Sequence, residues 1–254
     1  MRLLTLISIS FSFFAGAVSS SELNQLNYLT EQYPPYNYQQ EDGVIQGIAV
    51  DVLTAASEHV DSPVSLDMIK VQPWPRAYRS ALIKPDTVLF STTRTQLREH
   101  IFQWAGPISS TRIVVLAKRK RNITINQTIS LAQYRIGVIR DDVGEQLLLE
   151  LGVPRDSMIE SSVPDTLASQ LVKDRIDLWA YEENVAKWWL KKGGYNTDEY
   201  EVVYVLREGE LYFAFNLEVD QQMVSQLQKG LDAIKKTNQQ GGVSRYQQIL
   251  DKYR

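Results

Sequence analysis

Two arginines stand among small hydroxyl side chains in the segment STTRTQLREHIFQWAGPI, residues 91–108. A guanidinium can hold a carboxylate in a two-pronged fork of hydrogen bonds, and nearby hydroxyls can donate further hydrogen bonds to an anion. Because the segment follows an apolar, strand-like stretch, it predicts an anion site that uses Arg94 or Arg98, with Ser91 and Thr93 as donors. The same composition is also typical of a surface turn with ordinary ion pairs.

A second candidate group is the segment EQYPPY, which directly follows a predicted strand at residues 26–30. Its prolines predict a rigid loop, and Tyr33 and Tyr36 offer flat apolar faces that end in a polar hydroxyl. Glu31 opens the segment with a carboxylate. Because ligands of open α/β sheets bind beyond the carboxyl ends of strands, this loop is a candidate ligand contact. The tyrosines could equally pack this loop against the core of the domain that carries it.

Trp74 and Arg76 form a third group, in the stretch VQPWPRAYR after another apolar strand. Pro75 is well placed in the first turn of a helix, where its missing amide proton is not needed. An aromatic ring beside a cation at a strand end would suit an amphiphilic ligand. The alternative for Trp74 is packing in the core.

The elements that would position these groups alternate between strand and helix, which predicts an α/β fold with mainly parallel sheets. Hydrophobic patterning predicts strands at 26–30, 64–71, 88–91, 113–118, 136–139, 178–181, 202–206 and 211–215. It predicts helices at 50–59, 75–83, 145–151, 165–173, 185–192, 221–236 and 243–252.

Bulk properties limit the class of protein. Residues 1–20 have one basic residue, an apolar stretch and small residues near the end, which predicts a secretory signal peptide. The chain has no cysteine, so thiolate metal sites and cysteine nucleophiles are excluded. The formal charge of −3 argues against a nucleic-acid partner. We expect an exported monomer with no metal and no cofactor.

The motifs together resemble the bacterial periplasmic solute-binding proteins of the amino-acid-binding type, family 3. The resemblance rests on the aromatic and proline cluster at 33–36, the turn Asp42-Gly43, the helix start at 47–51 and the pattern Thr95, Arg98, Trp104, Pro107. It implies a two-lobed type II periplasmic-binding fold with a mainly parallel sheet in each lobe and two hinge strands. Lobe one would hold residues 21–118 and 209–254, and lobe two residues 119–208, after a basic step KRKRN.

The resemblance also implies roles for individual residues. Tyr33 would stack on the ligand, Arg98 would hold a carboxylate, and Ser91 and Thr93 would assist it. In lobe two, the segment DRIDLWAYEEN implies that Glu182 binds an ammonium group. Glu182 also falls where a helix is predicted to start, so its carboxylate could instead stabilise the positive end of the helix dipole.

One segment departs from the family pattern. Where amino-acid binders usually carry a Gly-Thr-Thr-like turn that meets the ligand carboxylate, this chain has Asp141, Asp142 and Val143. Two acids would repel a carboxylate, which makes an ordinary α-amino acid a poorer fit. Asp142 and Glu145 also match a capping box, in which they would serve only the helix.

The function that follows is capture of a small polar, zwitterionic or cationic ligand between two lobes, for delivery to an ABC-type transporter. A membrane receptor is the alternative partner, because a closed pair of lobes can also be sensed. A different class of function is a periplasmic dehydratase or lyase on the same scaffold, with Glu182 or Glu31 as general acid or base. A raised pKa of Glu182 would favour the enzyme.

Overall fold

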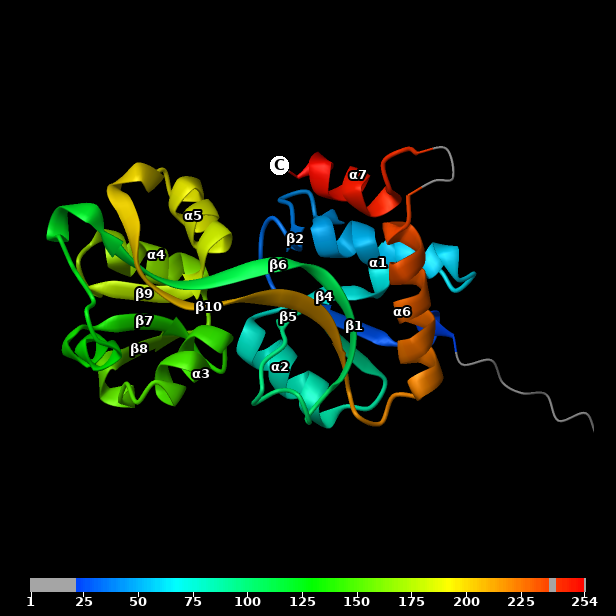
Figure 1. Ribbon diagram of the computed structural model, residues 1–254, viewed down its shortest axis with the longest axis horizontal. Coiled ribbons are helices and arrows are strands. Elements are labelled where there is room, and N and C mark those ends of the chain that lie inside the picture. Colours follow the sequence, from blue (N-terminus) through cyan, green and yellow to red (C-terminus); the bar gives the residue numbers. More distant parts are fainter. Residues whose placement is uncertain (1–21, 238–240, 254) are drawn as a thin grey trace, which may run out of the picture.

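The computed structural model describes residues 22–237 and 241–253, and the predicted signal peptide at 1–20 lies outside the described residues. Two lobes lie side by side and are joined by two long strands (Figure 1). The architecture is mixed α/β and two-lobed, as the sequence predicts. Within the described residues, no helix is both long and apolar enough to cross a membrane.

An eight-stranded sheet runs through both lobes in the order β4-β1-β5-β10-β6-β9-β7-β8. The pairs β1–β4, β1–β5, β7–β8 and β7–β9 are parallel, whereas β10 is antiparallel to β5 and β6, and β6 is antiparallel to β9. The strands are β1 (Asn27–Thr30), β4 (Ile69–Val71), β5 (Thr87–Thr93), β6 (Gln103–Lys118), β7 (Ile136–Ile139), β8 (Met158–Ser161), β9 (Leu178–Glu182) and β10 (Tyr200–Phe215). A small hairpin, β2 (Tyr38–Gln39) and β3 (Ile45–Gln46), stands apart.

Helices cover the sheet within each lobe (Figure 1). Lobe one carries α1 (Ile48–His59), α2 (Trp74–Ile83), α6 (Gln221–Lys235) and α7 (Arg245–Lys252), and lobe two carries α3 (Val143–Glu150), α4 (Pro164–Val172) and α5 (Glu183–Lys192). Their apolar faces are buried against strands that are buried on both sides, such as β5 and β9. This burial explains the short apolar runs within those strands, residues 88–90 of β5 and 178–181 of β9.

The two strands that join the lobes were only partly predicted. The sequence predicts separate strands at 202–206 and 211–215, but β10 continues through Arg207 to Glu210 without a break. The prediction was wrong because the polar stretch REGE, with its glycine, looks like a turn, whereas antiparallel pairing with β6 holds it extended. Strand β6 likewise starts at Gln103, ahead of the predicted start at Ile113.

Strand pairing shows where the chain passes between the lobes. Strand β6 pairs with β9 of lobe two from Ile113 to Ala117, and β10 pairs with β5 of lobe one from Leu211 onward. We propose that the hinge lies in the stretches 109–112 of β6 and 207–210 of β10. The boundary that the sequence predicts at Lys118 coincides with the last residue of β6.

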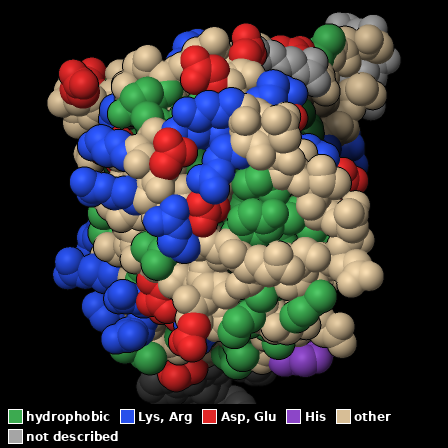
Figure 2. All heavy atoms as spheres, turned by 90° about the vertical axis from the view of Figure 1, so that its left-hand side faces the viewer, with side chains coloured by type: hydrophobic (Ala, Val, Ile, Leu, Met, Phe, Trp, Pro, Cys, Tyr) green, Lys and Arg blue, Asp and Glu red, His purple; other side chains and the backbone are tan. Residues whose placement is uncertain are grey.

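The expected cluster of basic residues 118–121 lies at the outer end of lobe two. Figure 2 shows lysine and arginine side chains gathered along one side of this end of the molecule. Several of them are paired with acids: Lys118 with Asp174 at 2.9 Å, and Arg121 with Asp177 at 2.8 Å. These pairs reduce the positive charge that a nucleic-acid backbone would need.

Candidate ligand-binding site between the lobes

The loop that carries the tyrosines is fixed by the start of α1. The amides of Ile48 and Ala49 donate to the carbonyl oxygens of Pro35 and Tyr36 at 3.1 and 2.7 Å. This close approach requires glycine at position 47, which has a φ of 133°, because a Cβ there would lie 2.3 Å from the Tyr36 oxygen. The helix start thus orients Tyr36 toward lobe two.

Arg98 occupies the centre of the contact between the lobes. Its side chain is 1% exposed and its guanidinium lies over the rings of Trp74 and Tyr78, at 5.3 and 5.1 Å from their centroids. It donates to the Thr93 carbonyl in lobe one at 3.3 Å. It also reaches lobe two, where Nε donates to Gln146 Oε1 at 3.0 Å.

A carbonyl group of lobe two completes the partners of Arg98. Asp141 has a left-handed backbone with a φ of 61°, and its carbonyl oxygen accepts from Arg98 at 3.4 Å and from Trp74 Nε1 at 2.9 Å. The contact that Asp141 makes with lobe one is therefore made by its backbone. Trp74 packs in the buried core, as one alternative had it, and its indole also donates across the interface between lobes.

Three buried carboxyl groups lie in the same interface: Glu31 of lobe one, and Asp142 and Glu182 of lobe two. Burial, reinforced by the charge of Asp142, raises the pKa of Glu31 well above its ordinary value. Burial likewise raises the pKa of Asp142 to about 6, although Arg98 acts in the opposite direction. Arg98 lowers the pKa of both Glu31 and Asp142, but desolvation is the larger effect in each case.

Glu182 links the two lobes and also serves α5. Its Oε2 accepts from the Val185 amide at 2.8 Å as the helix N-cap, and its Oε1 accepts from the Tyr36 hydroxyl at 3.0 Å. Burial raises the pKa of Glu182, and the hydrogen bonds from Val185 and Tyr36 oppose this shift. The helix-start role is therefore present, together with a contact across the interface that the sequence did not predict.

Asp142 serves the start of α3 without forming the regular capping box, since the backbone amides of Val143 and Gly144 still lower its pKa. It is the N-cap of α3 but makes no side-chain capping hydrogen bond, and its Oδ2 has no partner among the described residues. Glu145 reaches back to the Asp141 amide at 2.6 Å, one residue before the cap. The buried Asp142 carboxyl therefore keeps unused capacity to accept hydrogen bonds.

The hydroxyl groups predicted to assist Arg98 lie at the end of β5. Ser91 has a φ of 59° where the pairing of β5 with β10 shifts register, and this bulge sets it apart from its neighbours. Its Oγ and that of Thr95 (Oγ1) are buried without partners among the described residues. Thr93 is buried and contributes its carbonyl to Arg98.

Other predicted residues have different surroundings. Arg76 is exposed on α2, and Val143 is buried at the start of α3 in a small apolar cluster with Ile113 and Leu147. Arg94, the second candidate arginine, pairs with Glu99 and lies over Trp104 and Tyr212. Of the two arginines, Arg98 is the one in contact with lobe two.

Tyrosine rings fill the space beside the acids. Tyr33 meets Tyr36 at 5.6 Å between ring centroids and Tyr181 of lobe two at 5.7 Å, the latter edge to face. Sequence reasoning missed Tyr181 and Gln146. The available signals were their positions: Tyr181 directly precedes Glu182, and Gln146 lies one helical turn after Asp142.

A cavity of about 250 Å³ adjoins this cluster and has walls from both lobes. Glu31, Gln72 and Pro73 of lobe one face Val163, Pro164 and Trp189 of lobe two. No group of three or more histidine, cysteine or acidic side chains suited to a metal ion occurs in the described part of the chain. The arrangement of charges, hydroxyls and rings can bind a small polar molecule by hydrogen bonds and ion pairs.

Two lobes that meet over a polar cluster define a ligand-binding protein of the periplasmic-binding type. Residues 27–253 match the model of the bacterial extracellular solute-binding proteins, family 3, and the chain belongs to this family. No curated protein sequence matches the chain significantly.

Solved structures share the fold at low sequence identity. A histidine kinase sensor domain similar to periplasmic binding proteins has a TM-score of 0.76 at 16% identity, covering 91% of this chain and 96% of the other. An ancestral arginine-binding protein bound to arginine has a TM-score of 0.74 at 18% identity, covering 91% and 99%. The substrate-binding protein of an amino acid ABC transporter has a TM-score of 0.70 at 17% identity, covering 90% and 98%.

Proposed function

We propose that the protein is an exported periplasmic solute-binding protein that closes its lobes on a small zwitterionic or cationic molecule without changing it chemically. The observation that carries the proposal is the burial of Arg98 across the interface from Asp142, with the buried acids Glu31 and Glu182 in the same interface. Three carboxyl groups and one guanidinium share a dry place, and the raised pKa of each carboxyl group reflects the cost of negative charge there. A ligand with at least one ammonium group would offset it, and one carboxylate could pair with Arg98.

The arginine-bound relative of the same fold supports basic amino acids as the first ligands to test. The decisive experiment is a thermal-shift screen of the chain without residues 1–20 against amino acids, amines and dicarboxylates. A ligand that binds only the native state raises the melting temperature by mass action. We expect ligands with an ammonium group to give the largest shifts, and a dicarboxylate as tightest ligand would contradict the proposal.

Delivery to an ABC permease is our proposal for the partner, because a substrate-binding protein of such a transporter shares the fold. The histidine kinase sensor domain of the same fold supports a receptor as the second candidate. Photo-crosslinking of the ligand-loaded protein to native membranes would separate them. Capture of a permease subunit supports transport, and capture of a kinase or other receptor supports sensing.

The raised pKa values of Glu31 and Glu182 favour an enzyme as a further candidate. Burial in the contact between lobes accounts for both shifts, and Glu182 is already engaged by the Val185 amide and Tyr36. We therefore propose binding without chemistry. Mass spectrometry of the confirmed ligand after prolonged incubation tests this point, because a changed mass would establish turnover.

A further inference from the structure

A second cavity between the lobes, of about 550 Å³, lies along β6 on the side of α5 and α7. Figure 1 shows these two helices above the same long strand, one in each lobe. Tyr36 and Tyr253 line the cavity from lobe one, Ser110 from β6, and Lys187, Trp188 and Lys191 from lobe two. Its volume falls within the range of about 300 to 1,000 Å³ that is typical of small-molecule sites.

The charges around this cavity have one sign. Lys187 and Lys191, one helical turn apart on α5, are the only charged residues among its lining residues, and no carboxylate lines it. Lys187 pairs with Glu183 at 2.6 Å, whereas Lys191 makes no ion pair with another described residue. The wall therefore offers one unengaged ammonium group to an anion.

Aromatic rings form the rest of the wall. The indole of Trp188 and the rings of Tyr36 and Tyr253 give flat apolar faces, and Ser110 adds a hydroxyl. The Tyr253 hydroxyl is already engaged, since it donates to Asp51 at 3.0 Å and accepts from the Gly47 amide at 3.1 Å. Flat rings next to a lysine suit a planar ligand body that ends in a single negative charge.

We propose that this cavity is a second ligand site, distinct from the polar cluster around Arg98, and that it binds a small aromatic carboxylate. The ring lies against Trp188 and Tyr253, and the carboxylate pairs with Lys191. Because the walls belong to both lobes, an occupant binds the closed arrangement and favours it. The cavity meets the acidic cluster at Tyr36 and at Asn184, which contacts Glu182, whereas the residues proposed to hold the ligand, Trp188, Lys191 and Tyr253, are not part of that cluster.

The test is a fluorine NMR titration of the protein with 4-fluorobenzoate, with neutral 4-fluorobenzamide as the matched probe. We expect 4-fluorobenzoate to bind at least fivefold more tightly than the amide. Lys191→Gln should weaken 4-fluorobenzoate by about fivefold or more, because the charge partner is lost. Lys192→Gln is the matched control: it removes the next charge on α5, which lies over Trp188 and Trp189 and does not line this cavity.

Arg98→Lys separates this site from the polar cluster, since it keeps a positive charge there but loses the fork. Affinity for 4-fluorobenzoate should stay within twofold of the unchanged protein. An affinity lost with Arg98→Lys would place the probe in the cluster and overturn the inference. Equal weakening by Lys191→Gln and Lys192→Gln, or no binding to the unchanged protein, would overturn it as well.

Discussion

The hydroxyl of Tyr36 in lobe one donates a hydrogen bond of 3.0 Å to the carboxylate of Glu182 in lobe two. Both side chains are buried, and burial raises the pKa of each. Asn184, two residues after Glu182, adds longer contacts of 3.4 Å to both. A short chain of polar groups thus ties the aromatic loop of lobe one to the N-terminus of α5.

Tyr36→Phe removes this donor and leaves the ring in place. We expect ligand affinity to fall by about 3- to 10-fold. The buried Glu182 carboxylate loses the hydrogen bond from Tyr36, which can form only when the lobes are closed. Calorimetry on a ligand from the screen measures the effect. Tyr28→Phe is the control, since it removes a buried hydroxyl bonded within lobe one, to the Leu23 carbonyl. Equal loss of affinity in both variants would contradict a role in closure.

Arg98→Lys should weaken any ligand that carries a carboxylate by roughly tenfold or more, because an ammonium cannot reproduce the planar fork or its stacking on Trp74 and Tyr78. Arg94→Lys is the matched control on the same segment, where the arginine pairs with Glu99 instead. Unchanged affinity of the Arg98 variant in calorimetry would remove Arg98 from the site.

Glu182→Gln should weaken a cationic ligand by more than about tenfold while the fold is kept, since a glutamine oxygen can still accept from the Val185 amide. The neighbouring Glu183→Gln serves as control, because Glu183 pairs with Arg112 and Lys187. If the two variants bind the ligand equally well, Glu182 does not contact the ligand and serves only to cap α5 and to accept from Tyr36.

Asp142→Asn tests how much the burial of this ionised carboxyl lowers the free energy of unfolding. In the native protein the pKa of Asp142 is about 6, above its ordinary value of 3.8, so the folded state binds this proton more tightly than the unfolded chain. Protonation of the Asp142 carboxyl therefore stabilises the folded state fully below pH 3.8, and this stabilisation is lost as the pH rises to about 6. We expect the variant to be more stable than the unchanged protein at pH 7, on the order of 1 to 3 kcal/mol.

Urea unfolding at several pH values between 3.5 and 7 gives the free energies to compare. The gain from Asp142→Asn should shrink toward the acid end of this range, where the native carboxyl is protonated. Asp156→Asn, at an exposed position of lobe two, should give no such trend. A variant that is less stable than the unchanged protein at pH 7 would show that the attraction to Arg98 outweighs desolvation.

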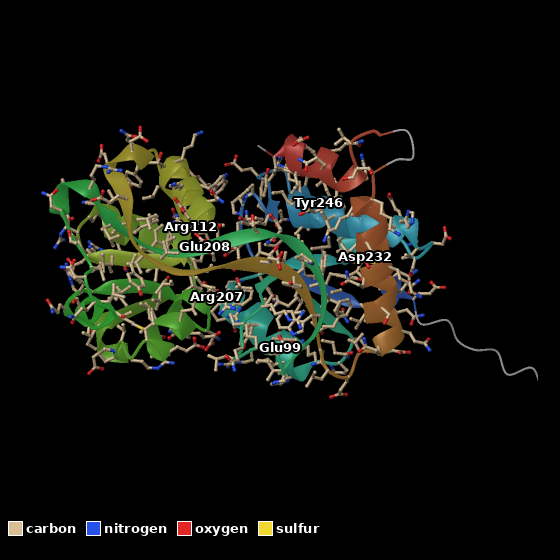
Figure 3. All side chains as sticks on the ribbon, in the orientation of Figure 1. Glu99, Arg112, Arg207, Glu208, Asp232 and Tyr246 are labelled. Carbon is tan, nitrogen blue, oxygen red and sulfur yellow. The ribbon has the colours of Figure 1, made fainter. Side chains whose placement is uncertain are left out.

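Ligand should draw the lobes together about the crossing of β6 and β10. Figure 3 shows Arg112, Arg207 and Glu208 where these strands pass between the lobes, and Arg112 pairs with Glu208 at 3.3 Å and also with Glu183. Small-angle scattering should record a smaller radius of gyration on saturation with a ligand from the screen. An unchanged radius with a proven ligand would contradict closure.

Local patterning in the sequence was sufficient to predict most elements of this fold. The predicted helices at 50–59, 75–83 and 221–236 correspond to α1, α2 and α6 within two residues at each end. Apolar periodicity and short polar turns carry this information, because each element buries one face wherever it is placed. The family motifs around Arg98 and Tyr33 likewise lie within single stretches of chain.

What only the tertiary structure decided is how segments far apart in the sequence combine. The continuity of β10 through the polar stretch 207–210 depends on pairing with β6, a strand nearly a hundred positions earlier. The contact of Asp141 is made by its backbone, because a left-handed turn directs the carbonyl toward Trp74 and Arg98. The partnership of Tyr36 with Glu182, and the raised pKa of Asp142, arise from burial between lobes. Such desolvation exists only after folding, so no pattern of neighbouring residues could specify it.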